Sequence, residues 1–306
     1  MTSCSDGSLA AAEQLEGSAP HAVAWVALEQ DGPWGAKAFT ASHLDPEVGR
    51  ALEDVAARHD VRPALIRPPG RHPDSPTVAR ARTVLVAHTR PGAAWLLVAT
   101  LTDPAALLDL DWAALRDGDR DAVRQSLPGL EPDDRAHLLV CTNGTRDVCC
   151  ASLGRPVASR AAALRPSRVW EVTHTSGHRF APTAVVLPAG TLHGRLDVPA
   201  AVALLDAADA GRTVLAGSRG RSTWPAAGQV AELAVRSSTG ETGIDALSVV
   251  DARRVGDLAW TVEVRHADGR TWRLDVVSEA TGLERRESCL KAAVPLRRWH
   301  TTADPA

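Results

Sequence analysis

The same order of predicted elements occurs twice along the chain, and this repeat restricts the fold more than any other feature. In each copy a buried strand is followed by a helix, a second strand and a two-stranded hairpin. The expected elements of the first copy are at 22–28, 46–58, 64–67, 82–88 and 95–101, and those of the second are at 137–140, 156–164, 168–173, 183–187 and 192–196. This alternation predicts an α/β protein with mixed sheets flanked by helices.

The repeat also predicts where the chain divides. Proline and glycine between 127 and 134 end any continuing pattern, and a helix near 225–236 and a hairpin turning at Asp268-Gly269 follow the second copy. The four expected segments are a flexible N-terminus at 1–21, an N-terminal half at 22–133, a second half at 134–212 and a small C-terminal α+β segment at 213–306. The order of elements in each half, with a proline-rich loop at 68–76 in the first, resembles a thioredoxin-like half-domain.

Composition excludes several classes of protein. With 306 residues, of which 44% are hydrophobic and 23% charged, the chain is long and apolar enough to fold around its own cores. A net charge of -3 gives no general attraction to nucleic acid. No apolar run reaches the roughly 20 residues that a spanning helix needs, and the N-terminus lacks the basic and apolar regions of a secretory signal. We therefore expect a cytoplasmic protein that binds neither nucleic acid nor membrane.

Two short segments, each directly after a predicted strand, concentrate the residues able to do chemistry. They are Cys141-Thr-Asn-Gly-Thr-Arg-Asp-Val-Cys149-Cys150 and His174-Thr-Ser-Gly-His178. Loops at the same end of neighbouring strands meet at one sheet edge, so thiols and imidazoles from both segments can surround one site. This donor set suits zinc or a 2Fe–2S cluster. Gly144 and Gly177 would let the backbone pass close to the bound group and leave amides free to point at it.

Other interpretations of the cysteines stay open at this level. A structural or regulatory zinc site could use the same ligands, although the cysteine spacing exceeds the usual two to four intervening residues of zinc fingers. A thiol–disulfide oxidoreductase would use Cys141 with Cys149 or Cys150, but the expected Cys-x-x-Cys spacing is absent. Cys4 and Cys289 have no histidine nearby in the sequence, and we expect both to be inert thiols.

Several motifs together carry a resemblance to a known family. They are the cysteine motif, the His-x-x-x-His that follows Val169-Trp170-Glu171, the continuation Arg179-Phe180-Ala181-Pro182-Thr183, and the stretches Glu29-Gln-Asp-Gly-Pro-Trp-Gly35 and Leu187-Pro-Ala-Gly190. By these motifs, residues 22–210 resemble the sucrase/ferredoxin-like family, whose core is a thioredoxin-like ferredoxin.

The resemblance implies a ligand set and a function. Thioredoxin-like ferredoxins hold a 2Fe–2S cluster with four cysteines, and in the branch that this chain resembles two histidines replace the second pair. The implied ligands are Cys141 and Cys150 on one iron, with Cys150 preferred to Cys149, and His174 and His178 on the other. The implied role is electron transfer or redox sensing with a redox partner protein of unknown identity, rather than turnover of a substrate.

Histidine ligation would have a physical consequence. Neutral imidazoles in place of anionic thiolates raise the reduction potential, as in Rieske centres, which span about -150 to +300 mV against roughly -400 mV for plant-type ferredoxins. The positive charges of Arg146 and Arg179 would also raise the reduction potential if they lie close to the cluster. An ion pair between Arg146 and Asp147 that stiffens the loop is an equally good interpretation of Arg146. Protons on the imidazoles would link the potential to pH. Thioredoxin-like folds also place a cis proline before a strand beside the active loop, and Pro182 matches that position.

Overall fold

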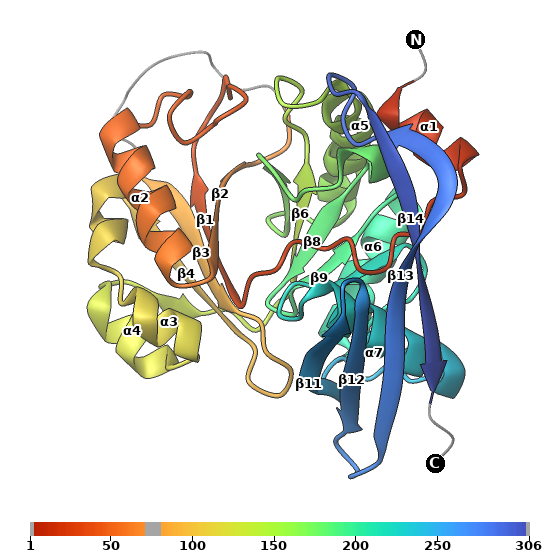
Figure 1. The fold of residues 1–306 in the computed structure, drawn as a ribbon. Coiled ribbons are helices and arrows are strands. Elements are labelled where there is room, and N and C mark those ends of the chain that lie inside the picture. Colours follow the sequence, from red (N-terminus) through yellow and green to blue (C-terminus); the bar gives the residue numbers. More distant parts are fainter. Residues whose placement is uncertain (1–2, 71–80, 304–306) are drawn as a thin grey trace.

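The computed structural model describes residues 3–70 and 81–303 and shows a mixed α/β fold around one ten-stranded sheet (Figure 1). The strands follow the order β10-β9-β8-β6-β7-β2-β1-β3-β4-β5. A separate four-stranded sheet, in the order β11-β12-β13-β14, belongs to the C-terminal part of the chain. The proline-rich loop predicted at 68–76 falls mostly outside the described residues. This architecture confirms the predicted fold class.

The ten-stranded sheet contains the predicted repeat as two four-stranded units. In the first unit β1 is parallel to β2 and antiparallel to β3, which pairs with β4; in the second, β6 is parallel to β7 and antiparallel to β8, which pairs with β9. The strands are β1 (Ala24–Glu29), β2 (Val61–Arg67), β3 (Arg82–His88), β4 (Trp95–Leu101), β5 (Glu131–Pro132), β6 (His137–Cys141), β7 (Val169–Val172), β8 (Ala184–Leu187) and β9 (Thr191–His193). The two units have the same strand order, and they join where β2 pairs antiparallel with β7.

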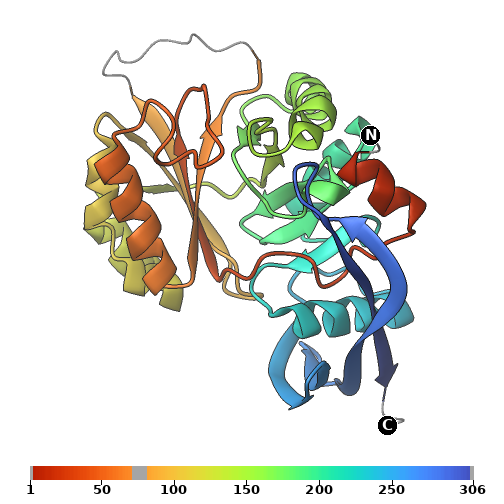
Figure 2. The same cartoon turned by 45° about the horizontal axis from the view of Figure 1, so that its top comes forward.

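Helices cover the outer face of each unit, and the inner faces share a core (Figure 2). The helices of the first unit are α2 (Pro46–Arg58), η1 (Pro104–Asp109), α3 (Trp112–Asp117) and α4 (Arg120–Ser126), and those of the second are α5 (Val148–Leu164), η2 (His178–Phe180) and α6 (Val198–Asp209). The shared core contains Trp25 and Ile66 of the first unit together with Leu139, Val172 and Val185 of the second. No helix in the described ranges is both long and apolar enough to cross a membrane.

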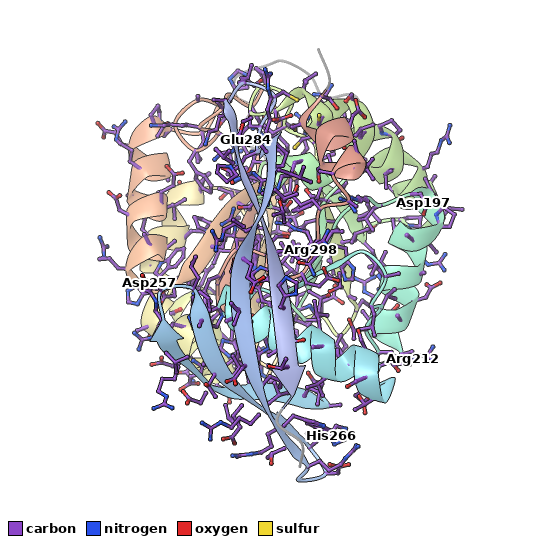
Figure 3. The ribbon with its side chains drawn as sticks, turned by 45° about the vertical axis from the view of Figure 1, so that its right-hand side comes forward. Asp197, Arg212, Asp257, His266, Glu284 and Arg298 are labelled. Atoms are coloured by element: carbon purple, nitrogen blue, oxygen red, sulfur yellow. The ribbon has the colours of Figure 1, made fainter. Side chains whose placement is uncertain are left out.

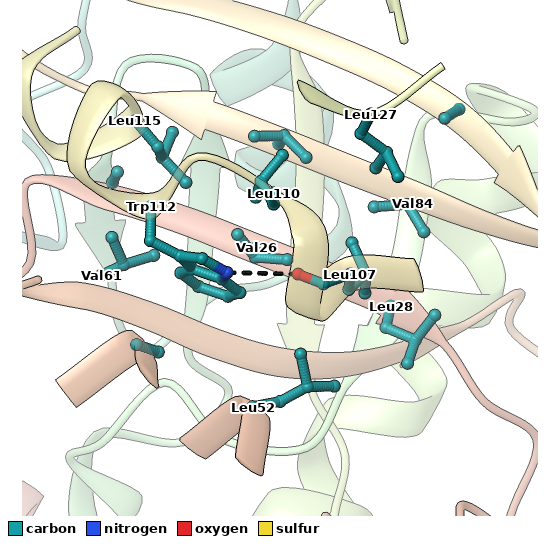
Figure 4. Packing of buried hydrophobic residues seen from close by; sticks show 14 of the residues in the cluster. Val26, Leu28, Leu52, Val61, Val84, Leu107, Leu110, Trp112, Leu115 and Leu127 are labelled. Carbon is teal, nitrogen blue, oxygen red and sulfur yellow. Dashed lines mark hydrogen bonds between the residues drawn. The ribbon is translucent and has the colours of Figure 1, made fainter. Parts of the chain in front are cut away.

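The outer core of the first unit explains why its helices form where they do. Leu52 of α2 and Trp112 of α3 belong to the same buried cluster as Val26 and Leu28 of β1 (Figure 4). The indole Nε1 of Trp112 donates to the carbonyl oxygen of Leu107 at 3.2 Å, so its buried polar group is satisfied. Since burying each large apolar side chain contributes about 1.5–3 kcal/mol, this cluster holds the short helices on the sheet.

The C-terminal part extends the large sheet and then forms the second sheet. β10 (Ser218–Arg221) pairs with β9, and α7 (Ala226–Thr239) shares an apolar cluster with the four-stranded sheet. That sheet consists of β11 (Leu247–Gly256), β12 (Ala259–His266), β13 (Thr271–Arg286) and β14 (Ala293–Ala303). Figure 3 shows β13 and β14 as a long ribbon across the molecule, with Glu284 near one end of it and His266 near the opposite end of the sheet.

The N-terminal segment is ordered, so the prediction of a flexible lead-in was wrong for residues 4–10. These residues form α1 (Cys4–Ala10), which begins where the Ser3 side chain accepts a hydrogen bond from the amide of Asp6. The small side chains of Ser5 and Ser8 are buried, which lets α1 pack closely against η2 and β13. The small polar residues of this segment suggested a chain exposed to solvent, whereas in the structure their small size permits close packing of a helix.

Helix α5 begins eight residues earlier than predicted, at Val148 rather than at 156. Asp147 caps it, since its carboxylate accepts from the amide of Cys149 at 3.0 Å. Pro156 resembles the proline of a first helical turn but lies inside the helix. Cys149 and Cys150 therefore occupy the first turn of α5 rather than a loop, and successive positions of a helix direct their side chains to different sides.

Candidate metal centre

Four predicted ligands lie at one edge of the second unit. Cys141 is the last residue of β6, and His174 follows the end of the parallel neighbour β7. Cys150 lies in the first turn of α5, and His178 begins η2. The carboxyl ends of β6 and β7 therefore bring the cysteine and histidine segments to one place, as the order of strands and loops predicts.

The side chains of this inner group contact one another. The Sγ atom of Cys150 lies 3.2 Å from Nδ1 of His178, and the rings of His174 and His178 stack with centroids 4.9 Å apart. Cys141 and Cys150 are both buried in the shared core, and Sγ of Cys141 lies 3.9 Å from the carbonyl oxygen of Thr173. Two sulfurs and two imidazoles are thus gathered in one largely buried place.

A tight turn between the two histidines produces their stacking. Ser176 and Gly177 adopt positive φ angles of 60° and 69°, so the chain reverses and brings His178 over His174. A Cβ atom at position 177 would lie 2.5 Å from Nη2 of Arg219. Glycine is required there both for the left-handed backbone and for the close approach of this guanidinium.

Burial and neighbours set the protonation of the four ligands. The neighbouring Cys150 thiol lowers the pKa of Cys141, with amide donors from Thr175 and Asn143 acting in the same direction. Cys141 in turn raises the pKa of Cys150. Burial, followed by the charge of Arg62, lowers the pKa of His174 to about 2, and burial also lowers the pKa of His178. Both imidazoles are therefore neutral near pH 7, which is the form that binds a metal.

Two arginines beside the site were not predicted from the sequence. Arg219 of β10 is fully buried and donates from Nη1 to the carbonyl oxygens of Thr175 at 3.2 Å and Ser176 at 3.1 Å. Arg62 of β2 donates to Oγ of Ser176 at 3.1 Å and lies over the ring of Trp25. Burial lowers the pKa of Arg219 to about 9 and that of Arg62 to about 10. Because they lie far from the ligand motifs in sequence, only the folded strand order could identify them.

Within the described ranges, neither of these guanidiniums has a carboxylate partner. Their hydrogen bonds go to carbonyl and hydroxyl oxygens, and the nearby groups that favour the charged form of Arg219 are Cys141 and Cys150. A buried positive charge is costly unless an anion compensates it. The site therefore presents uncompensated positive charge to whatever occupies it.

The structure also places the other residues that the sequence singled out, and the charge of Arg146 adds to the lowering of the pKa of both histidines by burial. Arg179 donates to Oε1 of Glu13 at 2.7 Å, and Arg146 donates to the carbonyl oxygen of Ala36 at 3.0 Å. Asp147 accepts from Cys149, Cys289 and Ser288, so the alternative role of Arg146, a pair with Asp147, is not the one observed. The Ala181–Pro182 peptide bond is cis, as predicted. A Cβ on Gly144 would lie 2.7 Å from that of Ala151, so this glycine allows the loop to pack on α5.

A second sulfur group lies on the other side of the first turn of α5. Sγ of Cys149 is 3.6 Å from that of Cys4 and 3.3 Å from that of Cys289, and the sulfurs of Cys4 and Cys289 are 3.5 Å apart. Carboxylate oxygens of Asp147 lie 3.7 and 3.8 Å from Sγ of Cys4. Cys4 and Cys289 were expected to be inert thiols, and tertiary packing brings them together across segments that lie 285 residues apart.

A pocket of about 400 Å³ connects the inner group to the surface. His174 and Arg62 line it from the second and first units, together with Lys37 and Arg146. His174 is the one of the four predicted ligands that reaches this pocket. Glu53 and Asp60 also line it, so the opening on the side of the histidine pair carries charges of both signs.

Comparison with known proteins gives one match. A family model described as sucrase/ferredoxin-like matches residues 15–220. No curated protein and no solved structure matches the chain. The matched range contains both units of the large sheet and all four inner ligands, whereas Cys4 and Cys289 lie outside it.

Proposed function

The chain belongs to the sucrase/ferredoxin-like family, and from that premise we propose that it is a 2Fe–2S protein for electron transfer or redox sensing. Cys141 and Cys150 would hold one iron, and His174 and His178 the other. The observation that carries this proposal is the meeting of two sulfurs and two neutral imidazoles at one sheet edge, with Cys150 and His178 in direct contact.

The inner donor set suits a dinuclear cluster better than a single ion. In the part of the chain that the structure describes, the group with three or more ligand atoms mutually within 4.8 Å is the outer one, Cys4, Asp147, Cys149 and Cys289. The inner ligands are more widely distributed, as ligands divided between two irons would be. Two thiolates for one iron and two histidines for the other is the arrangement of Rieske centres.

The residues around the inner group fit a cofactor that gains negative charge. A 2Fe–2S cluster supplies one-electron chemistry when bound. The buried Arg219 and the half-buried Arg62 provide positive charge without a carboxylate partner among the described residues, and this charge favours the reduced state. Cys141 and Cys150 are each 1% exposed, so water is excluded from the sulfur side. His174, at the pocket, gives a short route to a partner protein.

A second candidate function has one observation in its favour. The lowered pKa of Cys141 beside the Cys150 thiol is the electrostatic signature of a reactive dithiol. A thiol–disulfide oxidoreductase would use this pair without any metal. The histidine pair and the two uncompensated arginines have no role in that chemistry, and we therefore prefer the cluster.

Anaerobic purification of the full chain tests the proposal. We expect a brown protein that contains iron and acid-labile sulfide, with a visible spectrum bleached by dithionite and an EPR signal in the reduced state. Colourless protein with zinc in the inner group would contradict the cluster. Metal-free protein in which Cys141 and Cys150 cycle between dithiol and disulfide would support the oxidoreductase instead.

A further inference from the structure

The outer sulfur group forms a separate metal site. We propose that Cys4, Cys149, Cys289 and Asp147 bind one zinc ion, with three thiolates and one carboxylate as ligands. This inference does not depend on the cluster, because the two groups share no ligand.

The distances within the outer group fit a single tetrahedral ion. The three Sγ–Sγ distances are 3.3, 3.5 and 3.6 Å, and the Asp147 oxygens lie 3.7 and 3.8 Å from Sγ of Cys4. Zinc–sulfur bonds of about 2.3 Å place two sulfurs of a tetrahedral site ~3.8 Å apart. All four ligand atoms lie within 4.8 Å of one another. An ion at the centre would require only a slight outward movement of the sulfurs.

A disulfide explains this group less well than an ion does. A disulfide would join two sulfurs at about 2.05 Å and leave the third thiol unpaired. The structure instead shows all three thiols free, in nearly equal mutual contact, with a carboxylate beside them. Cys4, Cys149 and Asp147 are between 1% and 3% exposed. The Asp147 carboxylate thus lies buried against three thiols, and a bound cation would compensate the negative charge that three thiolates would add to it.

The surroundings of Asp147 hold it in the orientation that a ligand needs. Its Oδ1 accepts from the amide of Cys149 at 3.0 Å. Its Oδ2 accepts from the amide of Cys289 at 2.9 Å and from Oγ of Ser288 at 2.8 Å. Hydrogen bonds of this kind orient ligating carboxylates in metal sites. Two of these donors are the backbone amides of Cys149 and Cys289, which also supply thiols. The carboxylate is therefore hydrogen-bonded to the same residues with which it would share the ion.

Binding would be a proton-exchange reaction without any redox change. One Zn²⁺ ion would form three bonds to sulfur and one to a carboxylate oxygen, and the three thiols would release three protons to solvent. Zinc keeps its oxidation state throughout, and no oxidant or reductant is needed. The thiolate set would favour zinc over magnesium or calcium, which prefer oxygen ligands.

The ion would join three distant segments of the chain. Cys4 begins α1, Cys149 lies in the first turn of α5, and Cys289 lies in the turn between β13 and β14. These three elements lie side by side in both views of the fold (Figures 1 and 2). Cys4 and Cys289 lie outside the range 15–220 that the family model matches, so the site would be an addition made by the two flanking segments. It would fix the start of α5, where Cys150 follows Cys149.

Metal analysis of matched variants tests this inference. Full chain would be purified anaerobically under reducing conditions, and zinc and iron would be measured in the same sample. We expect one zinc ion per chain in the unaltered protein, and the loss of zinc with retention of iron in Cys4→Ser and Cys289→Ser. The matched control is Cys141→Ala, which should lose iron and retain zinc. Iron retained by the first two variants shows that they are folded.

A titration supplies the affinity and the coordination. Removal of zinc followed by addition of cobalt(II) should give intense sulfur-to-cobalt charge-transfer absorption, which Cys4→Ser and Cys289→Ser should lack. Zinc binding should weaken by ~100-fold or more in both variants. Substitution of a residue that only hydrogen-bonds to a ligand already lowers metal affinity by about 10–100-fold, and these variants remove a ligand itself. Ser288→Ala should weaken zinc binding by roughly tenfold.

The outcomes separate this site from the cluster. Protein with iron but no zinc, which also fails to bind added zinc under reducing conditions, would overturn the inference and leave the cluster intact. A disulfide between any two of Cys4, Cys149 and Cys289 in reduced, air-free protein would overturn it as well. Protein with zinc in the outer group but neither iron nor sulfide would instead contradict the cluster alone.

Discussion

The two units of the large sheet have the same strand order but different chemistry. The order β2-β1-β3-β4 of the first matches β7-β6-β8-β9 of the second, and they meet at the β2–β7 pair. After β1, the first unit has a loop closed by Trp34, whose Nε1 donates to the carbonyl oxygen of Gln30 at 2.9 Å. In the second unit, β6 ends at Cys141, and the capped start of α5 follows. Strand order therefore supplies a scaffold, whereas the loops at its carboxyl edge decide which unit can bind a metal.

The units also differ in what covers the edge that carries these loops. In the second unit, Glu13 accepts from both Arg179 of η2 and Arg285 of β13 at 2.7 Å, which ties both terminal segments to the candidate centre. In the first unit, Arg67 lies over the ring of Trp34 at 4.0 Å and donates to Glu171 of the second. The loop edge of the second unit is thus stabilised by residues outside the repeat. The loop edge of the first unit is stabilised by its own loop and by the second unit.

The largest expected effect comes from making the second unit resemble the first by removing a thiol. Cys150→Ala should abolish iron binding, because its sulfur contacts His178 beside Cys141. Cys149→Ala is the matched control and should retain iron, because the Cys149 sulfur contacts Cys4 and Cys289 instead. Iron content and visible absorption of the two anaerobically purified variants give the measurement. Equal iron in both would show that Cys150 is not a ligand.

The next largest effect concerns the buried Glu13 bridge. Glu13→Gln would leave the guanidinium of Arg179 without its carboxylate and that of Arg285 with Glu287 alone at 3.7 Å, in a place where Glu13 is 4% exposed. Breaking a buried ion pair of this kind costs roughly 3–5 kcal/mol, so we expect a loss of about 3 kcal/mol in the free energy of unfolding. Urea-induced unfolding measures it.

The control for the Glu13 bridge is an exposed pair in the same unit. Asp206→Asn breaks the contact between Arg165 and Asp206, whose side chains are 33% and 51% exposed. Such pairs contribute about 0–1 kcal/mol, so this variant should differ little from the unaltered protein. Similar losses in the two variants would mean that Glu13 does not hold the termini on the second unit.

The third prediction concerns the histidine pair, which distinguishes the second unit from a ferredoxin with four cysteines. His174→Cys should keep a cluster and lower its reduction potential by on the order of 100 mV, because an anionic thiolate replaces a neutral imidazole. His21→Cys places the same thiol in the lining of the same pocket and should leave the potential unchanged. Redox titration followed by EPR measures both. An unaltered potential in His174→Cys would argue against ligation by His174.

The sequence was sufficient to predict the repeat, the fold class and the meeting of the two ligand segments. Strands at β3 and β4 were predicted with the observed bounds, and α2 begins after Asp45 and ends at Arg58 as expected. These features follow from local periodicity, caps and the rule that loops at one sheet edge meet.

What could not be predicted depends on contacts between distant segments. The contact between Cys4 and Cys289 is an example, because nothing in local sequence shows that α1 and the β13–β14 turn meet at α5. Arg219 belongs to β10, and only the pairing of β10 with β9 brings it beside the histidine turn. The early start of α5 was missed because Pro156 is a stronger local signal than the cap at Asp147.

The smallest expected effect is a loss of stability in acid that originates in the second unit. Burial lowers the pKa of His193 in β9 to about 4, below the usual value of about 6.5 for an unfolded chain. The unfolded state therefore binds more protons between these values, so this contribution to stability is present above pH 6.5 and is lost as the pH falls toward 4. Between pH 7.5 and pH 5 the free energy of unfolding should fall by roughly 2 kcal/mol from this group alone. Urea unfolding at several pH values should show that slope flattened in His193→Gln but retained in His300→Gln, since His300 is exposed. Equal slopes in the two variants would place the acid sensitivity elsewhere in the chain.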